Sequence, residues 1–120
     1  MAKLTPFGKA LRVYRVNHEQ SQYDVADALG VSVAFWSALE TGKKNASKEL
    51  QKKIVAHFGL NNIQVAELEH LALLSQQEIN INMTKLNDRS RELVVGFARN
   101  FSSLDDEKQK KLKKLLEMED

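Results

Sequence analysis

The sequence predicts a mainly α-helical fold for its 120 residues, with five helices in the first 75. Apolar residues recur every three or four positions, which is the period of one helix face. Small polar residues that can accept hydrogen bonds from free backbone N–H groups precede most of the expected helices. Glycine follows several of them, where a left-handed backbone ends a helix at little cost. These signals also place a boundary near Gln76, between a first domain of residues 1–75 and a second region of residues 76–120.

Caps and apolar faces define the expected helices of the first domain. Thr5 followed by Pro6 is a strong helix start, because proline at the first helical position loses no helical hydrogen bond. Ser21, with Asp24 three residues later, forms a variant of the capping box before the second helix. The five helices are expected at residues 6 to about 17, 22–29, 33–40, 48–58 and about 63–75.

Composition and charge exclude several kinds of site and indicate where a charged partner would bind. The chain contains no cysteine, which excludes disulfides and thiolate metal sites, and no apolar run approaches the ~20 residues that cross a bilayer. The N-terminus lacks the apolar segment of a signal peptide, so a cytoplasmic, nucleoid-associated protein without a membrane partner is expected. Residues 1–60 hold nine Lys and Arg against five Asp and Glu, and residues 61–120 hold nine against eleven. A polyphosphate partner is therefore expected at the first half, although a chance fluctuation explains the counts equally well.

No pattern in the sequence favours an enzyme. His18, His57 and His70 stand far apart in the chain. Glu67 and Glu69 lie near His70, but not at the helical spacing of metal ligands. The chain has neither a Gly-rich phosphate loop nor a nucleophile elbow. A non-enzymatic protein without metal or cofactor is therefore expected.

The most specific motif spans residues 22–39 and has the layout of two helices joined by a tight turn. Ala26 is a small residue at the point where the helices would cross, and Gly30 tolerates positive φ in the turn. The apolar residues that would lock the second of these helices onto the core are Val31, Trp36 and Leu39. A generic helical hairpin with the same turn is the alternative interpretation.

Further segments around this motif extend the pattern. They are Gly8-Lys9-Ala10-Leu11-Arg12, Ser21-Gln22, Val25-Ala26, Leu29-Gly30-Val31-Ser32 and Leu39-Glu40-Thr41-Gly42-Lys43. With them, the stretch from Phe7 to Leu60 resembles the phage repressor and Cro-like helix-turn-helix family. The resemblance implies a five-helix repressor-like domain that binds double-stranded DNA. It also implies that Arg15 and Glu40 form a structural ion pair.

The DNA contacts follow from the same resemblance. Gln22, at the N-terminus of the second helix, would bind a phosphate with help from the helix dipole. Lys43 and Lys44 would clamp a phosphate as point charges, unless they belong to a solvated loop. The DNA-binding residues that the resemblance implies are Gln22, Ser32, Val33, Ala34, Phe35, Ser37, Ala38, Lys43, Lys44 and Asn45.

The third helix departs from the common pattern of the family, because its expected exposed face is mostly apolar. Val33 and Ala34 suit thymine methyl groups, and Ser37 can hydrogen-bond to several bases. Direct readout would then be weak and DNA shape would carry more of the specificity, or the apolar face binds a protein instead. Phe35 either wedges against the sugar–phosphate backbone or packs on the fourth helix.

The second region begins with a segment, residues 78–83, in which polar and apolar residues alternate. A period of two with β-branched residues predicts a strand. Because no second strand is expected in the chain, its backbone would pair with the same strand of a second copy, unless the segment is an extended linker. Two helices are expected next, one from Ser90 to Phe101 and one from Asp105 onward. The expected dimerisation residues are Ile79, Ile81, Met83, Leu93 and Phe97, although the stripe formed by the last two with Phe101 also fits a core against the final helix.

These features together predict a homodimeric transcriptional repressor of a phage-like operon or of its own operon. One recognition helix covers only a few base pairs, whereas two that lie ~34 Å apart read a palindromic operator. An antitoxin-type autorepressor, whose second region binds a toxin protein, is the alternative. The five lysines within residues 108–114 are expected on a solvated helix face, with extra DNA contact as the alternative.

Overall fold

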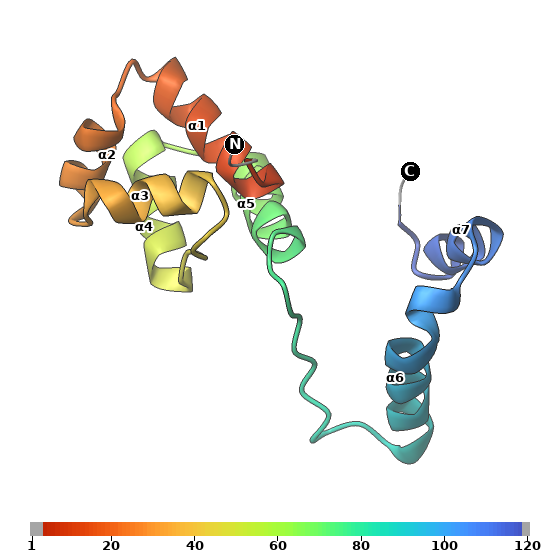
Figure 1. Cartoon of the computed structure of the whole chain (residues 1–120). Helices are drawn as coiled ribbons and strands as arrows, with labels where there is room; N and C mark the ends of the chain where they lie inside the picture. Colours follow the sequence, from red (N-terminus) through yellow and green to blue (C-terminus); the bar gives the residue numbers. More distant parts are fainter. Residues whose placement is uncertain (1–3, 119–120) are drawn as a thin grey trace. The chain divides into compact units, whose positions relative to one another are not determined.

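Seven α-helices and one short 3₁₀ helix form the regular structure of the computed structural model, which describes residues 4–118 (Figure 1). The elements are α1 (Pro6–Asn17), α2 (Gln22–Leu29), α3 (Val33–Glu40), α4 (Lys48–Phe58), α5 (Asn62–Leu74), α6 (Asp88–Asn100), η1 (Phe101–Ser103) and α7 (Asp106–Leu115). The chain divides into two compact units, Met1–Ile79 and Asn80–Asp120. The prediction of a mainly helical fold is confirmed. No helix within residues 4–118 combines the length and the apolar character needed to cross a lipid bilayer.

Side-chain caps determine where the helices of the first unit begin. Thr5 and Ser21 cap α1 and α2 as predicted, each accepting a hydrogen bond from the backbone N–H three residues later. Ser32 and Ser47 cap α3 and α4 in the same way. α5 begins at Asn62, because Asn61 caps it and Gln64 completes a capping box. The sequence reasoning placed this start one residue later, because it relied on apolar periodicity.

The core of the first unit draws on all five of its helices. Its largest fully buried side chains are Leu11, Val25, Trp36, Leu39, Ile54 and Leu68. α3 packs against α1 and α2, α4 packs against α2, and α5 packs against α1. The side chain of Ser75 accepts a hydrogen bond from the backbone N–H of Phe7 at 3.1 Å, which ties the end of α5 to the start of α1. The unit therefore holds α3 against α1 and α2, while Val33 and Ala34 of α3 stay exposed.

Residues 75–87 contain neither helix nor strand, so the strand predicted at residues 78–83 is wrong. Ile79 and Ile81 are both exposed, so the alternating pattern provides no buried face on which a strand could pack. A lone extended segment in water can hydrogen-bond to solvent, whereas a strand needs a neighbour for its backbone groups. The intermolecular ribbon expected through Ile79, Ile81 and Met83 depended on this strand and loses its basis.

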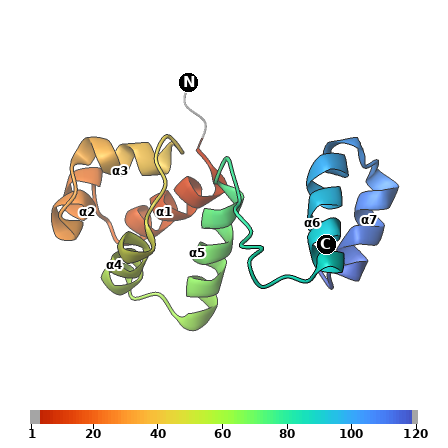
Figure 2. The same cartoon turned by 90° about the horizontal axis from the view of Figure 1, so that it is seen from below.

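The second unit consists of α6, η1 and α7, and Figure 2 shows the two α-helices next to each other. α6 begins at Asp88, before the expected Ser90, because Asn87 caps it. None of the residues in α6, η1 or α7 is buried. The apolar residues of this unit therefore contribute to its surface.

Candidate nucleic-acid interface

The turn between α2 and α3 is determined by its hydrogen bonds and by one glycine. Gly30 has φ of 73°, the left-handed conformation that glycine adopts without strain. The carbonyl of Ala26 accepts from the backbone N–H of Val31 at 3.0 Å, which closes the turn. Ala26 itself is buried where the two helices meet, so a larger side chain there would push them apart. These residues have the positions that the motif predicted for them.

The start of α2 is held by a reciprocal capping box. The Ser21 hydroxyl accepts from the backbone N–H of Asp24 at 3.0 Å, and the Asp24 carboxylate accepts from the Ser21 N–H at 2.9 Å. The backbone N–H of Ser21, followed by its side chain, lowers the pKa of Asp24 below its ordinary value of 3.8. Gln22, the next residue, is half-buried at the first position of α2. The capping box therefore fixes the backbone at the start of α2, from which the Gln22 side chain extends.

The orientation of α3 is set by a buried polar contact at its C-terminal end. Glu40 is only 2% exposed. Its carboxylate accepts from Arg15 Nε at 2.9 Å and from Arg15 Nη2 at 3.2 Å, and also from the indole N–H of Trp36. Arg15 Nη1 donates in addition to the Gln20 carbonyl at 3.2 Å. The ion pair that the family resemblance implied is therefore present, and it joins α1, the start of the motif and α3.

Close backbone contact between α1 and α3 supports the same orientation. A Cβ on Gly8 would lie 1.9 Å from the carbonyl oxygen of Glu40, so only glycine fits at this crossing. Gly42, with φ of 79°, lies equally close to α1, because a Cβ there would be 2.1 Å from Cγ2 of Thr5. These contacts cannot be predicted from the sequence, since no local pattern relates residues so far apart.

The outer face of α3 carries the residues expected to read DNA. Val33 is 40% exposed, Ala34 is exposed, and Ser37 and Ala38 are half-buried. The Ser32 hydroxyl accepts from the backbone N–H of Phe35 at 3.0 Å, so it serves as the helix cap. This face is small and mostly apolar, as the sequence suggested.

Phe35 has a different environment from the rest of that face. Its ring is half-buried and packs against the hydrophobic core of the first unit. This contact buries part of the ring, and contact of its exposed part with the sugar–phosphate backbone stays a prediction.

The loop after α3 places three polar residues beside the same face. Lys43, Lys44 and Asn45 are all exposed. The carbonyl of Ala38 accepts from the backbone N–H groups of Lys43 at 2.8 Å and Lys44 at 3.2 Å. The two lysines are therefore anchored at the C-terminal end of α3 by their backbone, while their side chains remain in solvent.

One contact near Gln22 was not found from the sequence. His57 Nε2 and Gln20 Oε1 lie 2.8 Å apart, which ties α4 to the residues just before α2. The two residues are 37 positions apart, so only the fold brings them together. The predicted DNA-binding residues of α2, α3 and the following loop thus all belong to one braced unit.

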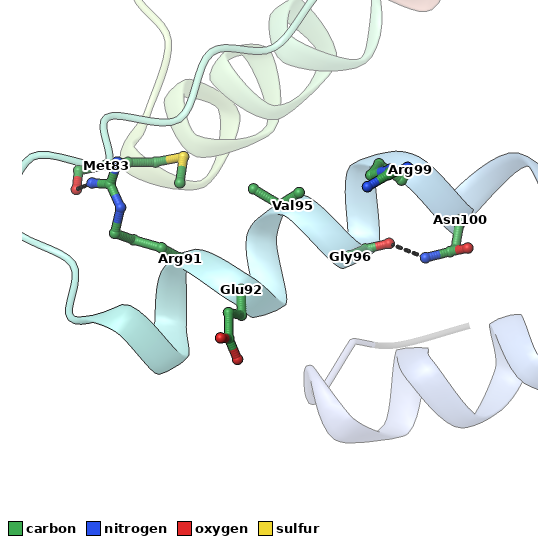
Figure 3. Close-up of a pocket in the computed structure, with 7 residues that line it drawn as sticks. All are labelled: Met83, Arg91, Glu92, Val95, Gly96, Arg99 and Asn100. Carbon is green, nitrogen blue, oxygen red and sulfur yellow. Dashed lines mark hydrogen bonds between the residues drawn. The ribbon is translucent and has the colours of Figure 1, made fainter.

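The second unit has a concave region that is a rival candidate site (Figure 3). Its lining residues are Met83, Arg91, Glu92, Val95, Gly96, Arg99 and Asn100. Arg91 Nη1 donates to the Met83 carbonyl at 2.8 Å, and Asn100 Nδ2 donates to the Gly96 carbonyl at 2.7 Å. Two of its polar side chains thus bind the unit's own backbone, and Arg91 holds Met83 in the segment before α6. Within residues 4–118, no three His, Asp or Glu side chains are grouped so that they could hold a metal ion.

Comparison with known families agrees with this geometry. A family model described as a helix-turn-helix domain matches residues 6–71, which covers α1 to α4 and most of α5. Searches of curated proteins and of solved structures gave no match. The family match extends over more than half of the 120 residues. The chain therefore belongs to the helix-turn-helix family of DNA-binding regulators.

Proposed function

We propose that this chain is a sequence-specific transcriptional repressor of a phage-like operon or of its own operon, and that it binds its operator as a homodimer. The observation that carries the proposal is the arrangement around α3. An exposed helix face has Gln22 at the start of the preceding helix and Lys43, Lys44 and Asn45 in the loop that follows. A recognition helix in the major groove needs such phosphate-binding groups around it to fix its register.

Phosphate binding is assigned to Gln22, Lys43, Lys44 and Asn45. The amides of Gln22 and Asn45 can donate to phosphate oxygens, and the two lysines supply positive charge without reading sequence. The capping box at Ser21 fixes the backbone at the start of α2, and the backbone hydrogen bonds to Ala38 fix the backbone of Lys43 and Lys44 before DNA arrives. Less ordering is then needed on binding, which favours affinity.

Base reading is assigned to Val33, Ala34 and Ser37, with Ser32 and Ala38 at the edges of the contact. The methyl groups of Val33 and Ala34 suit the C5-methyl of thymine, and the Ser37 hydroxyl can donate or accept. A face of this kind makes few directional contacts, so the deformability of the operator would carry part of the specificity.

Repression follows from occupancy of a promoter by two such units. One α3 reaches only a few base pairs, so a second copy is needed for a site long enough to be specific. A homodimer reading a palindrome on one face of the duplex would exclude RNA polymerase from an overlapping promoter.

The test is DNA binding to the region upstream of the protein's own gene, measured by fluorescence anisotropy between about 50 and about 200 mM salt. The variant Gln22→Ala, Lys43→Ala, Lys44→Ala should bind much more weakly, and its slope of log affinity against log salt should be smaller by about 4, because two charged phosphate contacts are lost in each of the two copies on the operator.

A matched control is Gln77→Ala, Lys85→Ala, Lys114→Ala, which removes the same residue types at exposed positions outside the helix-turn-helix. It should retain the affinity and the salt slope of the wild type. Circular dichroism should show the same helix content for all three proteins. Unchanged binding by the first variant would show that the docking is wrong, and absence of salt-dependent DNA binding by the wild type would refute the function.

A further inference from the structure

The groove between α6 and α7 contains apolar side chains that the described residues of the second unit cover only in part. Phe97 and Phe101 contact each other with ring centroids 5.1 Å apart, yet they remain 46% and 45% exposed. Leu116, at the end of α7, lines the same groove and is 58% exposed. Since no residue of α6, η1 or α7 is buried, the two helices have no closed core of their own. A further surface against this groove would supply one.

Charges on the rim of this groove follow a definite order along α7. Asp106 lines it at the N-terminal end of the helix, and Lys110 and Lys113 line it farther along. Positions four and seven residues apart lie on one side of a helix, so the acidic and the basic end share one edge. An edge of this kind is complementary to its own copy turned by 180°, because a twofold contact pairs residue i with j and j with i.

An intrachain explanation accounts for only part of the pattern. Asp106 and Lys110 are four residues apart, a spacing that favours ion pairing within one helix. Such a pair does not cover Phe97, Phe101 or Leu116. A partner of a single charge sign would match only half of the edge. A second copy both covers the apolar groove and matches the two charged ends.

We propose that this groove binds a second copy of the chain, with the two α7 helices antiparallel across a twofold axis. Each α7 covers Phe97, Phe101 and Leu116 of the other copy, and the acidic end of each α7 faces the basic end of the other. The inference rests on the homodimer of the proposed function. It locates the dimer interface in α6 and α7 and leaves residues 75–87 as the connection to the DNA-binding unit.

The apolar part of the proposal is tested by sedimentation equilibrium of the full chain. Leu116→Ser should raise the dimer dissociation constant by at least about tenfold, because the interface contains the residue twice. Val13→Ser on α1 is the matched control, because Val13 is 53% exposed but lies in the first unit. It should leave the dimer unchanged. A wild-type chain that stays monomeric at about 100 µM, or equal effects of the two variants, would overturn the proposal.

The antiparallel geometry is tested by charge reversal and mixing. Asp106→Lys alone, and Lys110→Glu with Lys113→Glu in a second protein, should each weaken self-association through like-charge repulsion across the twofold axis. An equimolar mixture should form the heterodimer, because each acidic end again meets a basic end. If the charges matter only within one helix, mixing restores nothing and the geometry is refuted. Helix content measured by circular dichroism should be the same before and after mixing.

The failure of this inference can be told apart from the failure of the proposed function. Binding to a single half-site requires the helix-turn-helix but not the dimer, so Leu116→Ser should bind a half-site as the wild type does. Dimerisation without DNA binding would refute the repressor and leave this interface standing. DNA binding by a monomeric wild type would refute this interface and the homodimer, and would leave DNA binding by the helix-turn-helix standing.

Discussion

Arg15 of α1 and Glu40 of α3 form a two-pronged ion pair, with Nε to Oε2 at 2.9 Å and Nη2 to Oε1 at 3.2 Å. The Glu40 carboxylate is almost fully buried and also accepts from the Trp36 indole N–H. Substituting one partner of such a pair leaves the other charge buried without compensation, which costs more than the intact pair contributes. The contact therefore makes the orientation of α3 depend on one carboxylate.

Glu40→Ala should lower the free energy of unfolding by about 3–5 kcal/mol, because Arg15 and the Trp36 N–H both lose their buried acceptor. Urea unfolding followed by Trp36 fluorescence measures this loss. Glu49→Ala is the control, because Glu49 is an exposed glutamate in the first turn of α4. It should change stability by less than about 0.5 kcal/mol. Equal effects of the two substitutions would mean that the ion pair is not structural.

Gly8→Ala should destabilise the first unit by at least about 2 kcal/mol, because the added Cβ collides with backbone atoms that cannot move aside without separating α1 from α3. Gly96→Ala in α6 is a matched control with the opposite expectation, because a Cβ there meets nothing within 4 Å. It should be neutral or stabilising by up to about 1 kcal/mol, since alanine favours a helix over glycine. Thermal unfolding of both variants gives the comparison, and a stable Gly8→Ala protein would contradict the helix crossing.

The Asp24 carboxylate should make stability depend on pH at the acidic end. Its pKa is lowered in the folded chain, so its charge stabilises the fold above the ordinary value of 3.8, and that stabilisation is lost as pH falls through the folded pKa. Asp24→Asn keeps an oxygen that can accept from Ser21 but removes the charge. The stability difference from wild type should be constant above pH of about 5 and should vanish at the lowest pH reached. A stability difference that stays the same down to the lowest pH would show that the Asp24 charge does not stabilise the fold.

The features predicted most accurately from the sequence are the helix caps and the turn, which local hydrogen bonds determine. Ser21, Gly30 and Ser32 act on residues within a few positions, so a cap or a turn can be recognised without knowledge of the fold. The scaffold of the helix-turn-helix was predictable for this reason. The contacts of Gly8 with Glu40 and of Gln20 with His57 were not, because they exist only once α1, α3 and α4 have packed.

The strand prediction was wrong for a related reason, because it relied on a local pattern while strand formation depends on distant contacts. Alternation in residues 78–83 is a local signal, but a strand is stable only with a neighbour and a buried face, and Ile79 and Ile81 have neither in the described chain. The residues expected to bind DNA are likewise not determined by local pattern. The structure positions them on one unit, and their contacts with bases and phosphates stay predictions for binding experiments.

Thymine methyl groups should contribute measurably to operator binding. Replacing a contacted thymine by uracil removes only the C5-methyl, so affinity should fall about three- to fivefold if that methyl packs against Val33. The variant Val33→Ala should reduce this loss, because the side chain that sensed the methyl has become smaller. Anisotropy titrations of both proteins on both DNAs form a double-mutant cycle. Equal losses for wild type and variant would show that Val33 does not contact that base.

The connection between the two units should make the dimer tolerant of half-site spacing. Residues 76–82, between the hydrogen bonds of Ser75 and Met83, contain no helix or strand, and fully extended they reach about 25 Å. Two such connections let two helix-turn-helix units reach half-sites that are one further helical turn apart, so inserting about 10 base pairs should weaken wild-type binding by less than about tenfold. A chain lacking residues 78–82 should bind the original operator but lose much more on the longer one. If the wild type bound the longer operator no more tightly than it binds a single half-site, the two units would instead be held in one fixed arrangement.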